Sequence, residues 1–231
     1  MSSSALGDLL LGVREVRALR GFPPKHPSRT ATSHLREEAR IAHRRACVVL
    51  LSSHYERYIY ALNESVVDFL NGSQILSVEV PIEIRLLQVK TVVDELAKTE
   101  WSRRGDRLND LFSQFSSHWQ PSEAISGLQA SANLEWMKSP KIGDVKRYFR
   151  YFGVEDIVRV VTRNEATRRA MGRQLQSLVD ARNGIAHGDQ TIQPDPAEIS
   201  DYLAAVEAFC VRVDKVMAQR LGRLADSAPP W

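Results

Sequence analysis

The sequence predicts an all-α bundle, and three observations support this prediction. Apolar residues recur every three or four positions in several long segments, which is the period of a helix buried on one side. Convincing alternation of apolar and polar residues is absent, and only residues 73–81 suit a short extended piece. Glycine and proline mark short connections between the periodic segments. Helices joined in this way form a bundle without a sheet only if their apolar faces meet, so we expect a single helical core.

The composition is that of a soluble globular chain. Of the 231 residues, 43% are hydrophobic and 26% are charged, and this length suits one large domain better than two small ones. The net charge is only +3, so any nucleic-acid-binding surface has to be local. Apolar runs stay below the roughly 18 residues of a membrane span, and the N-terminus lacks a secretory signal pattern. We therefore expect a cytoplasmic protein that makes no membrane contact.

The two cysteines, Cys47 and Cys210, lie inside apolar helical patterns. A free cysteine in such a place behaves as a small hydrophobic residue. Neither belongs to a zinc-binding spacing, and two cysteines make no disulfide framework. We expect buried, inert thiols, no metal and no cofactor.

Residues 1–31 are expected to form an N-terminal arm that is loosely ordered or docks on the body, because the prolines of GFPPKHPS interrupt any helix. A long helix then runs from about Thr32 to Gly72, with apolar residues on more than one side. Such a helix suits the spine of a bundle, and its second apolar side suits a dimer contact. We place one helical domain at residues 32–225 and a short tail at 226–231.

Further helices follow the spine, each bounded by proline, glycine or polar turn residues. The segment within 123–137 is serine-rich, and we expect a weak, short helix there. A helix that starts near Ile142 is closed by Gly153. The other expected helices span residues 82–98, 108–119, 164–187 and 197–224. We expect the spine, the 164–187 helix and the last helix to pack together.

The most informative stretch is LVDARNGIAHG, residues 178–188. Arg182 continues the apolar stripe of its helix, where a guanidinium needs a carboxylate, a phosphate or other acceptors, since an unpaired interior charge costs several kcal/mol. Asp180, Asn183 and His187 line up on an adjacent face of the same helix. A cation, an amide and an imidazole therefore share one helix end.

Glu56, in the spine helix, is the first candidate for the carboxylate that pairs with Arg182. Three other carboxylates stay open as alternatives: Asp68, Glu95 and Asp180. A purely structural interpretation is also open, in which Arg182 belongs to a buried ion pair and His187 caps the helix end, where an imidazolium meets the helix dipole.

RNGIAH, an Arg-x4-His near the end of a late helix, resembles the signature of HEPN domains. The order of LLSSHYERYIYAL, KRYFRYFGVEDI and LVDARNGIAHG is similar to the RiboL-PSP branch of that family, over roughly residues 40–220. The resemblance implies a metal-independent endoribonuclease that works as a homodimer, with two motifs facing each other across the two-fold axis. It implies that His187 handles protons, that Arg182 steadies the phosphate, that Asn183 is the accompanying polar residue, and that the products carry 2′,3′-cyclic phosphates.

The resemblance also implies a toxin–antitoxin, stress or phage-defence setting, with RNA as substrate and an antitoxin or regulatory protein as a further partner. One position departs from some HEPN toxins, which carry a tyrosine two residues after the histidine that a partner enzyme modifies. This chain has Asp189 there. We therefore do not expect regulation by that route.

The chemistry of these residue types agrees with the resemblance. RNA cleavage by its own 2′-hydroxyl needs a base, an acid for the leaving oxygen, and positive charge on the phosphorane oxygens. His187 suits either proton role and Arg182 suits the third. The two side chains are about 140° apart on an ideal helix, so we expect a two-fold pair of motifs to complete the site. Asn183 and Gly184 are expected to loosen the helix and turn His187 inward.

Two basic clusters with interleaved aromatic residues are weaker candidates for contact with RNA, and we single out Arg44, Arg45, Arg147 and Arg150. His34, His43 and His54 lie beside arginines, and we expect them on a solvated helix face.

Two other classes of function stay open. The chain is then either a catalytically inactive HEPN module that binds nucleotide, RNA or a partner protein, or a purely structural helical bundle. Cleavage of a generic RNA in EDTA separates the enzyme from both.

Overall fold

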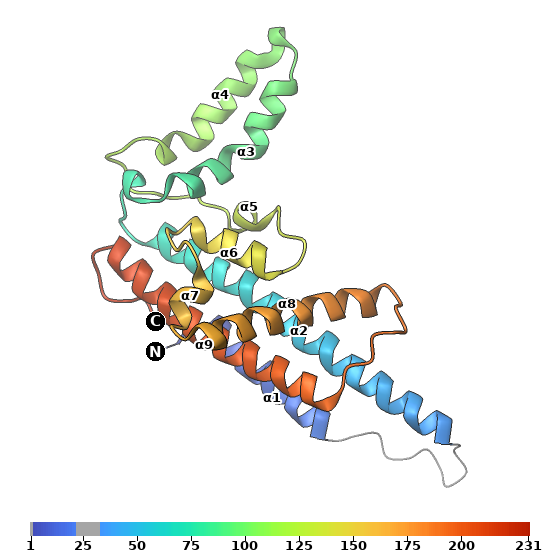
Figure 1. Ribbon diagram of the computed structural model, residues 1–231. Helices are drawn as coiled ribbons and strands as arrows, with labels where there is room; N and C mark the ends of the chain where they lie inside the picture. The colour runs from blue at the N-terminus through green and yellow to red at the C-terminus, as the bar shows by residue number, and fades with distance from the viewer. Residues whose placement is uncertain (1, 22–32) are drawn as a thin grey trace.

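The computed structural model describes residues 2–21 and 33–231, and this part of the chain is helical and contains no strand (Figure 1). An isolated bridge between Leu76 and Ala124 is its one extended pairing, within the stretch where the sequence suits a short extended piece. The α-helices of the described part are α1 (Ser4–Gly21), α2 (Ser33–Gly72), α3 (Ile82–Lys98), α4 (Arg104–Phe115), α5 (Ala130–Leu134), α6 (Ile142–Arg150), α7 (Ile157–Val161), α8 (Glu165–Ala186) and α9 (Pro196–Leu224).

The all-α prediction is confirmed, and the long helices lie where helical periodicity places them. The predicted spine is α2, the motif helix is α8, and the last helix is α9. The weak helix expected within 123–137 is reduced to the five residues of α5. Helix α7 was not predicted. It is N-capped by Asp156, whose carboxylate accepts from the amides of Val158 and Arg159.

Residues 4–21 of the expected arm form α1, which packs along α2 and α9 (Figure 1). Its buried apolar side chains follow helical spacing: Leu6, Leu9, Val13 and Val16. The hydroxyl of Ser3 accepts from the Leu6 amide, and the buried carboxylate of Asp214 on α9 accepts from the Ser3 amide over 3.2 Å. Residues 4–21 of the expected arm therefore dock on the body of the bundle. Residues 22–32 lie outside the described residues.

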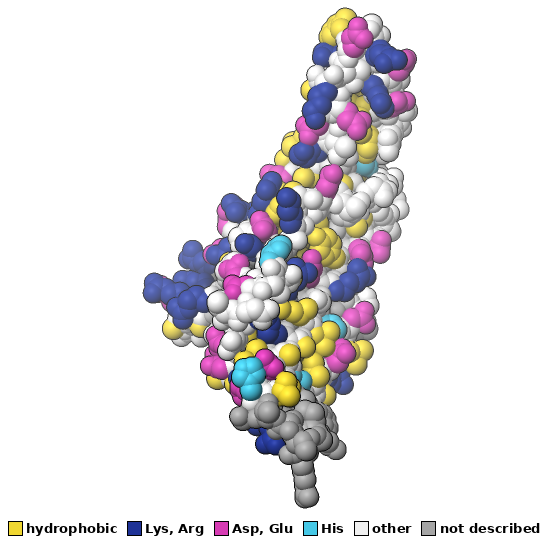
Figure 2. Space-filling model, turned by 90° about the vertical axis from the view of Figure 1, so that its right-hand side faces the viewer, with side chains coloured by type: hydrophobic (Ala, Val, Ile, Leu, Met, Phe, Trp, Pro, Cys, Tyr) yellow, Lys and Arg dark blue, Asp and Glu magenta, His cyan; other side chains and the backbone are white. Residues whose placement is uncertain are grey.

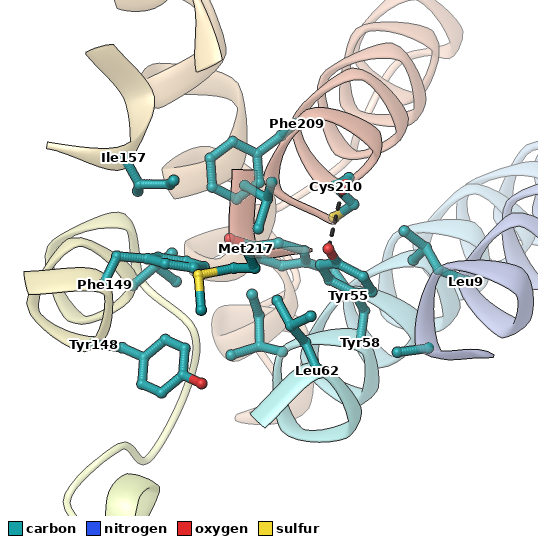
Figure 3. Close-up of a cluster of buried hydrophobic side chains, with 14 of the residues drawn as sticks. Leu9, Tyr55, Tyr58, Leu62, Tyr148, Phe149, Ile157, Phe209, Cys210 and Met217 are labelled. Carbon is teal, nitrogen blue, oxygen red and sulfur yellow. Dashed lines mark hydrogen bonds between the residues drawn. The ribbon is translucent and has the colours of Figure 1, made fainter. Parts of the chain in front are cut away.

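The core lies where α2, α8 and α9 pack together, with α6, α7 and α1 closing its sides (Figures 1 and 3). Tyr58 of α2 is buried among these helices and its hydroxyl donates to the carbonyl of Cys210 over 3.0 Å. Cys47 and Cys210 are free and buried, as predicted, and burial raises the pKa of both thiols. A thiol held in its neutral form is a poor nucleophile, which agrees with inert cysteines.

Helices α3 and α4 form a hairpin that projects from one end of the bundle (Figure 1). A buried amide network joins its base to the bundle. Gln88 of α3 donates to Asn133 of α5, which donates to Asn63 of α2, each over 3.0 Å. Tyr148 of α6 also donates to Asn63, over 3.2 Å. Because these groups satisfy one another, the network fixes the hairpin's base without leaving a costly unpaired polar group.

Candidate functional site

Arg182 reaches from α8 to α2 and pairs with a carboxylate there. Its Nη2 lies 3.2 Å from Oε2 of Glu56, and its Nη1 donates to Oδ1 of Asn183 over 3.0 Å. The first-choice partner from the sequence is therefore the one in the structure. The side chains of Arg182 and Glu56 are 30% and 22% exposed, so the guanidinium is half-buried at the edge of the apolar stripe rather than fully buried within it. A guanidinium has five N–H donors, and those that do not serve Glu56 and Asn183 are left for an anion.

The three alternative carboxylates lie elsewhere. Asp180 accepts from Nε2 of Gln176 over 2.8 Å and lies 3.5 Å from Nζ of Lys141. Asp68 and Glu95 are exposed on α2 and α3. Asp180 is thus exposed on α8 and belongs to a separate group of polar contacts from Arg182 and Asn183.

His187 is the C-cap residue of α8 and its side chain is exposed. The helix ends in a Schellman motif, in which Gly188 donates to the carbonyl of Ile185 over 3.1 Å and Asp189 donates to that of Gly184 over 3.0 Å. Gly188 has a φ of +83°, a left-handed conformation that favours glycine. The imidazole makes no hydrogen bond or ion pair with any residue in the described part of the chain, which leaves both ring nitrogens available to a substrate.

The expected loosening of the helix at Asn183 and Gly184 is wrong. Helix α8 is continuous to Ala186. The side chain of Ile192, in the following loop, lies directly over Gly184 in the space that a Cβ would occupy. This contact stabilises the regular helix end, so Arg182 faces α2 while His187 stays on another side of α8.

Asp189 has a structural role in the loop. Its Oδ1 accepts from the backbone amide and hydroxyl of Thr191 over 2.8 and 2.7 Å. These hydrogen bonds, the hydroxyl first and the amide second, lower the pKa of Asp189 below its ordinary value. The carboxylate therefore forms an Asx-type turn.

The described residues contain no group of three or more His, Cys, Asp or Glu side chains able to hold a metal ion. The site is therefore a cation, an amide and an imidazole at one end of α8, next to a carboxylate of α2. The sequence matches the family model described as RiboL-PSP-HEPN over residues 23–219. The chain belongs to the RiboL-PSP-HEPN family. Neither the curated proteins nor the solved structures contain a match to the chain.

HEPN domains are helical, commonly bind RNA and commonly form dimers, and membership indicates a ribonuclease-type or nucleotide-binding function. None of the helices in residues 2–21 and 33–231 is long and apolar enough to cross a membrane.

Among the basic residues of this HEPN domain that were considered for RNA contact, three make internal contacts. Arg44 lies 3.1 Å from Glu37, and Arg45 donates to two carbonyls of the loop after α8. Arg147 stacks on Trp136, with 4.2 Å between Cζ and the ring centroid, and donates to the hydroxyl of Tyr151 over 2.9 Å. Arg150 is exposed.

Figure 2 shows Lys and Arg interspersed with Asp and Glu over most of one face of the HEPN domain, with a group of basic side chains at its left edge. A local basic surface is therefore present, but the face as a whole is mixed, in line with the small net charge of the chain.

Two of the three histidines expected on a solvated face are instead packed against α1. Nε2 of His43 lies 2.8 Å from the carbonyl of Leu19. His54 covers Gly12 and lies 3.2 Å from Glu15, with a side chain only 26% exposed. Only His34 of the three is exposed, beside Glu38. Neither packed histidine was identified from the sequence, because α1 itself was not.

A recess of about 380 Å³ lies one turn along α2 from Glu56, where Tyr60 forms part of its wall. Burial, and then the neighbouring Glu56 carboxylate, raise the pKa of Tyr60, whose hydroxyl donates to the carbonyl of Met137 over 2.8 Å. Glu64 and Glu135 also line this recess. Two carboxylates disfavour an anion in this recess.

Proposed function

We propose that this chain is a metal-independent endoribonuclease that cleaves RNA by attack of the substrate's own 2′-hydroxyl. The observation that carries the proposal is the end of α8, where Arg182 is oriented by Glu56 and Asn183 and keeps unused donors, and where the exposed imidazole of His187 has free ring nitrogens. The family supports the same class of function.

The residues match the steps of this reaction. The 2′-oxygen attacks phosphorus as its proton passes to a base, and the bond from phosphorus to the 5′-oxygen breaks as an acid protonates that oxygen. An imidazole serves as base or acid near neutral pH. The planar fork of Arg182 binds two phosphorane oxygens where negative charge develops. The products are a 2′,3′-cyclic phosphate and a 5′-hydroxyl.

A composite site in a homodimer fits this geometry. In one chain Arg182 faces α2, whereas His187 lies exposed on another side of α8. Each chain also supplies one motif histidine, whereas the reaction is best served by separate acid and base groups. An isologous contact between two α8 ends doubles the set and brings arginines and histidines of different chains together. Two arginines in one cleft repel each other when empty, which favours an anionic ligand such as RNA.

The test is cleavage of a generic RNA by the purified protein in excess EDTA, with analysis of the ends. We expect cyclic-phosphate or 3′-phosphate ends. His187→Ala, Arg182→Ala and Arg182→Lys each abolish cleavage, the last because a point charge cannot replace the planar fork. His34→Ala and Arg57→Ala are matched controls, because His34 is an exposed histidine elsewhere on α2 and Arg57 pairs with Glu64 on the surface. Both controls keep wild-type activity.

Full cleavage by His187→Ala contradicts the catalytic assignment. Products with 3′-hydroxyl and 5′-phosphate ends that appear only with magnesium contradict the metal-independent reaction. Binding of RNA or nucleotide without cleavage under any condition identifies the inactive HEPN module instead.

As a toxin or phage-defence effector, the enzyme acts inside the cell that makes it. We expect expression in a bacterial host to slow growth, and His187→Ala to remove the effect at equal protein levels. An antitoxin or regulatory partner restores growth when it covers the α8 end. Equal toxicity of wild-type and His187→Ala proteins contradicts this part of the proposal.

A further inference from the structure

The loop that follows His187 is a built structure. The Schellman motif fixes residues 187–189, the turn between Asp189 and Thr191 fixes the next residues, and Ile192 folds back onto Gly184. His187 thus stands at the junction between a regular helix end and a tight loop. Any group that holds this loop also holds the position of the imidazole.

Arg45 of α2 holds the loop from outside. Its Nη1 donates to the carbonyl of Asp189 over 2.8 Å and to the carbonyl of Ile192 over 3.2 Å. One guanidinium nitrogen therefore ties both ends of the turn to α2. Arg45 is 144 residues away in sequence from Asp189, the first of the two acceptors. A charged donor makes stronger hydrogen bonds than a neutral one, and the guanidinium carries its charge at any working pH.

Arg45 and Glu56 lie on the same face of α2. They are eleven residues apart, which corresponds to about 20° of rotation and about 16 Å of rise on an ideal helix. Glu56 binds Arg182, and Arg45 binds the loop next to His187. Both halves of the motif on α8 are therefore fixed to one rigid helix.

We infer that Arg45 is a positioning residue for the cleavage reaction, one that sets the place of His187 relative to Arg182 and does not itself bind RNA. This inference rests on the proposed function. Nη1 of Arg45 is engaged by the two loop carbonyls, and the role inferred for Arg45 depends on these hydrogen bonds rather than on attraction to phosphate. A positioning residue and a phosphate-binding residue differ in three measurable effects of substitution: the hydrogen exchange of the loop, the kcat of RNA cleavage, and the salt dependence of RNA affinity.

The experiment compares Arg45→Met, which keeps an apolar stem but removes the donors, with Arg45→Lys, which keeps a charge and donors at shorter reach. Arg40→Met is the matched control, because Arg40 lies on the same helix and pairs with Glu37 on the surface. Hydrogen exchange is measured for peptides covering residues 184–193, without RNA. We expect faster exchange in Arg45→Met, intermediate exchange in Arg45→Lys, and no change in Arg40→Met.

Cleavage kinetics follow for the same proteins. We expect kcat of Arg45→Met to fall by about 10- to 100-fold with little change in KM, since misplacing a reacting group by about 1 Å can cost about 100-fold. Arg45→Lys keeps part of the activity. RNA affinity is measured against salt concentration with His187→Ala as background. Adding Arg45→Met leaves the salt slope unchanged, whereas loss of a phosphate contact reduces it by about 1.

A salt slope reduced by about 1 together with unchanged exchange shows that Arg45 contacts phosphate and overturns the inference. Faster exchange with an unchanged kcat makes Arg45 merely structural and also overturns it. If Arg45→Met does not fold, the comparison of Arg45→Lys with wild type decides in the same way. Wild-type protein that cuts no RNA contradicts the proposed function as well, whereas wild-type cleavage with an unaffected variant contradicts this inference alone.

Discussion

The guanidinium of Arg182 and the carboxylate of Glu56 meet across the contact between α8 and α2, with 3.2 Å between Nη2 and Oε2. Both side chains keep part of their surface in water. A pair that keeps this contact with water contributes less to folding than a fully buried one, and it also fixes the orientation of the guanidinium.

Glu56→Gln tests that orientation. The amide keeps the size of the side chain but loses the charge, so we expect the free energy of unfolding to change by less than about 1 kcal/mol. Cleavage falls by about 10- to 100-fold because Arg182 is no longer held. Urea unfolding and kcat measure the two effects, with Glu64→Gln on the same helix as control. A large loss of stability with normal turnover would make the pair structural.

The composite site predicts complementation between inactive variants. His187→Ala supplies Arg182, and Arg182→Ala supplies His187, so a mixed dimer contains one arginine and one histidine, half of the doubled set, whereas each variant alone lacks one residue type altogether. We expect activity to appear after subunit exchange, above that of either variant alone, and the proteins to sediment as dimers at assay concentration. A monomer with full wild-type cleavage would rule the composite site out.

The end of α8 predicts opposite effects for two glycine substitutions. Gly188→Ala destabilises by about 1–2 kcal/mol because the left-handed backbone disfavours a Cβ. Gly172→Ala, in the interior of the same helix with open space around it, stabilises by about 0.5–1 kcal/mol. Urea unfolding of both variants checks the pair. Equal effects on the two sites would mean that the helix end seen here is not the one in solution.

The lowered pKa of Asp156, the N-cap of α7, predicts a pH-dependent contribution to the free energy of unfolding. Burial acts to raise its pKa, but the hydrogen bond from Lys146 and the amides of Arg159 and Val158 outweigh burial and lower it below the ordinary 3.8. A lowered pKa in the folded state contributes stability above the ordinary value, and this is lost as pH falls through the folded value. The difference in unfolding free energy between wild type and Asp156→Asn should stay constant from about pH 5 to pH 8 and shrink below about pH 3.8. A constant difference down to about pH 2 would contradict it.

The long helices were predictable because each repeats apolar residues over many turns. Helix α7 was not, since five residues are too short to show a period. Helix α1 was not predicted because the prolines after residue 21 interrupt any helix, although Leu6, Leu9, Val13 and Val16 have helical spacing.

Contacts of the site that join two side chains could be predicted from the sequence, whereas contacts to the backbone could not. Arg182 on an apolar stripe requires an acceptor, which the sequence predicts, whereas Glu56 was only the first of four candidate carboxylates and the structure selects it. The contacts of Arg45 go to backbone carbonyls, which every residue has, and these leave no signal in the sequence. Its position among other arginines instead suggested a role in RNA contact.

The contact between Gly184 and Ile192 has an evolutionary consequence. The terminal methyl of Ile192 occupies the space of a Cβ at position 184, so a larger residue at 184 requires the isoleucine side chain to move. Relatives that carry alanine or serine at the position of Gly184 should carry a smaller residue at that of Ile192, and relatives that keep a large residue at 192 should keep the glycine. The glycine of the RNGIAH motif, Gly184, thus reflects the packing of the loop that follows the motif.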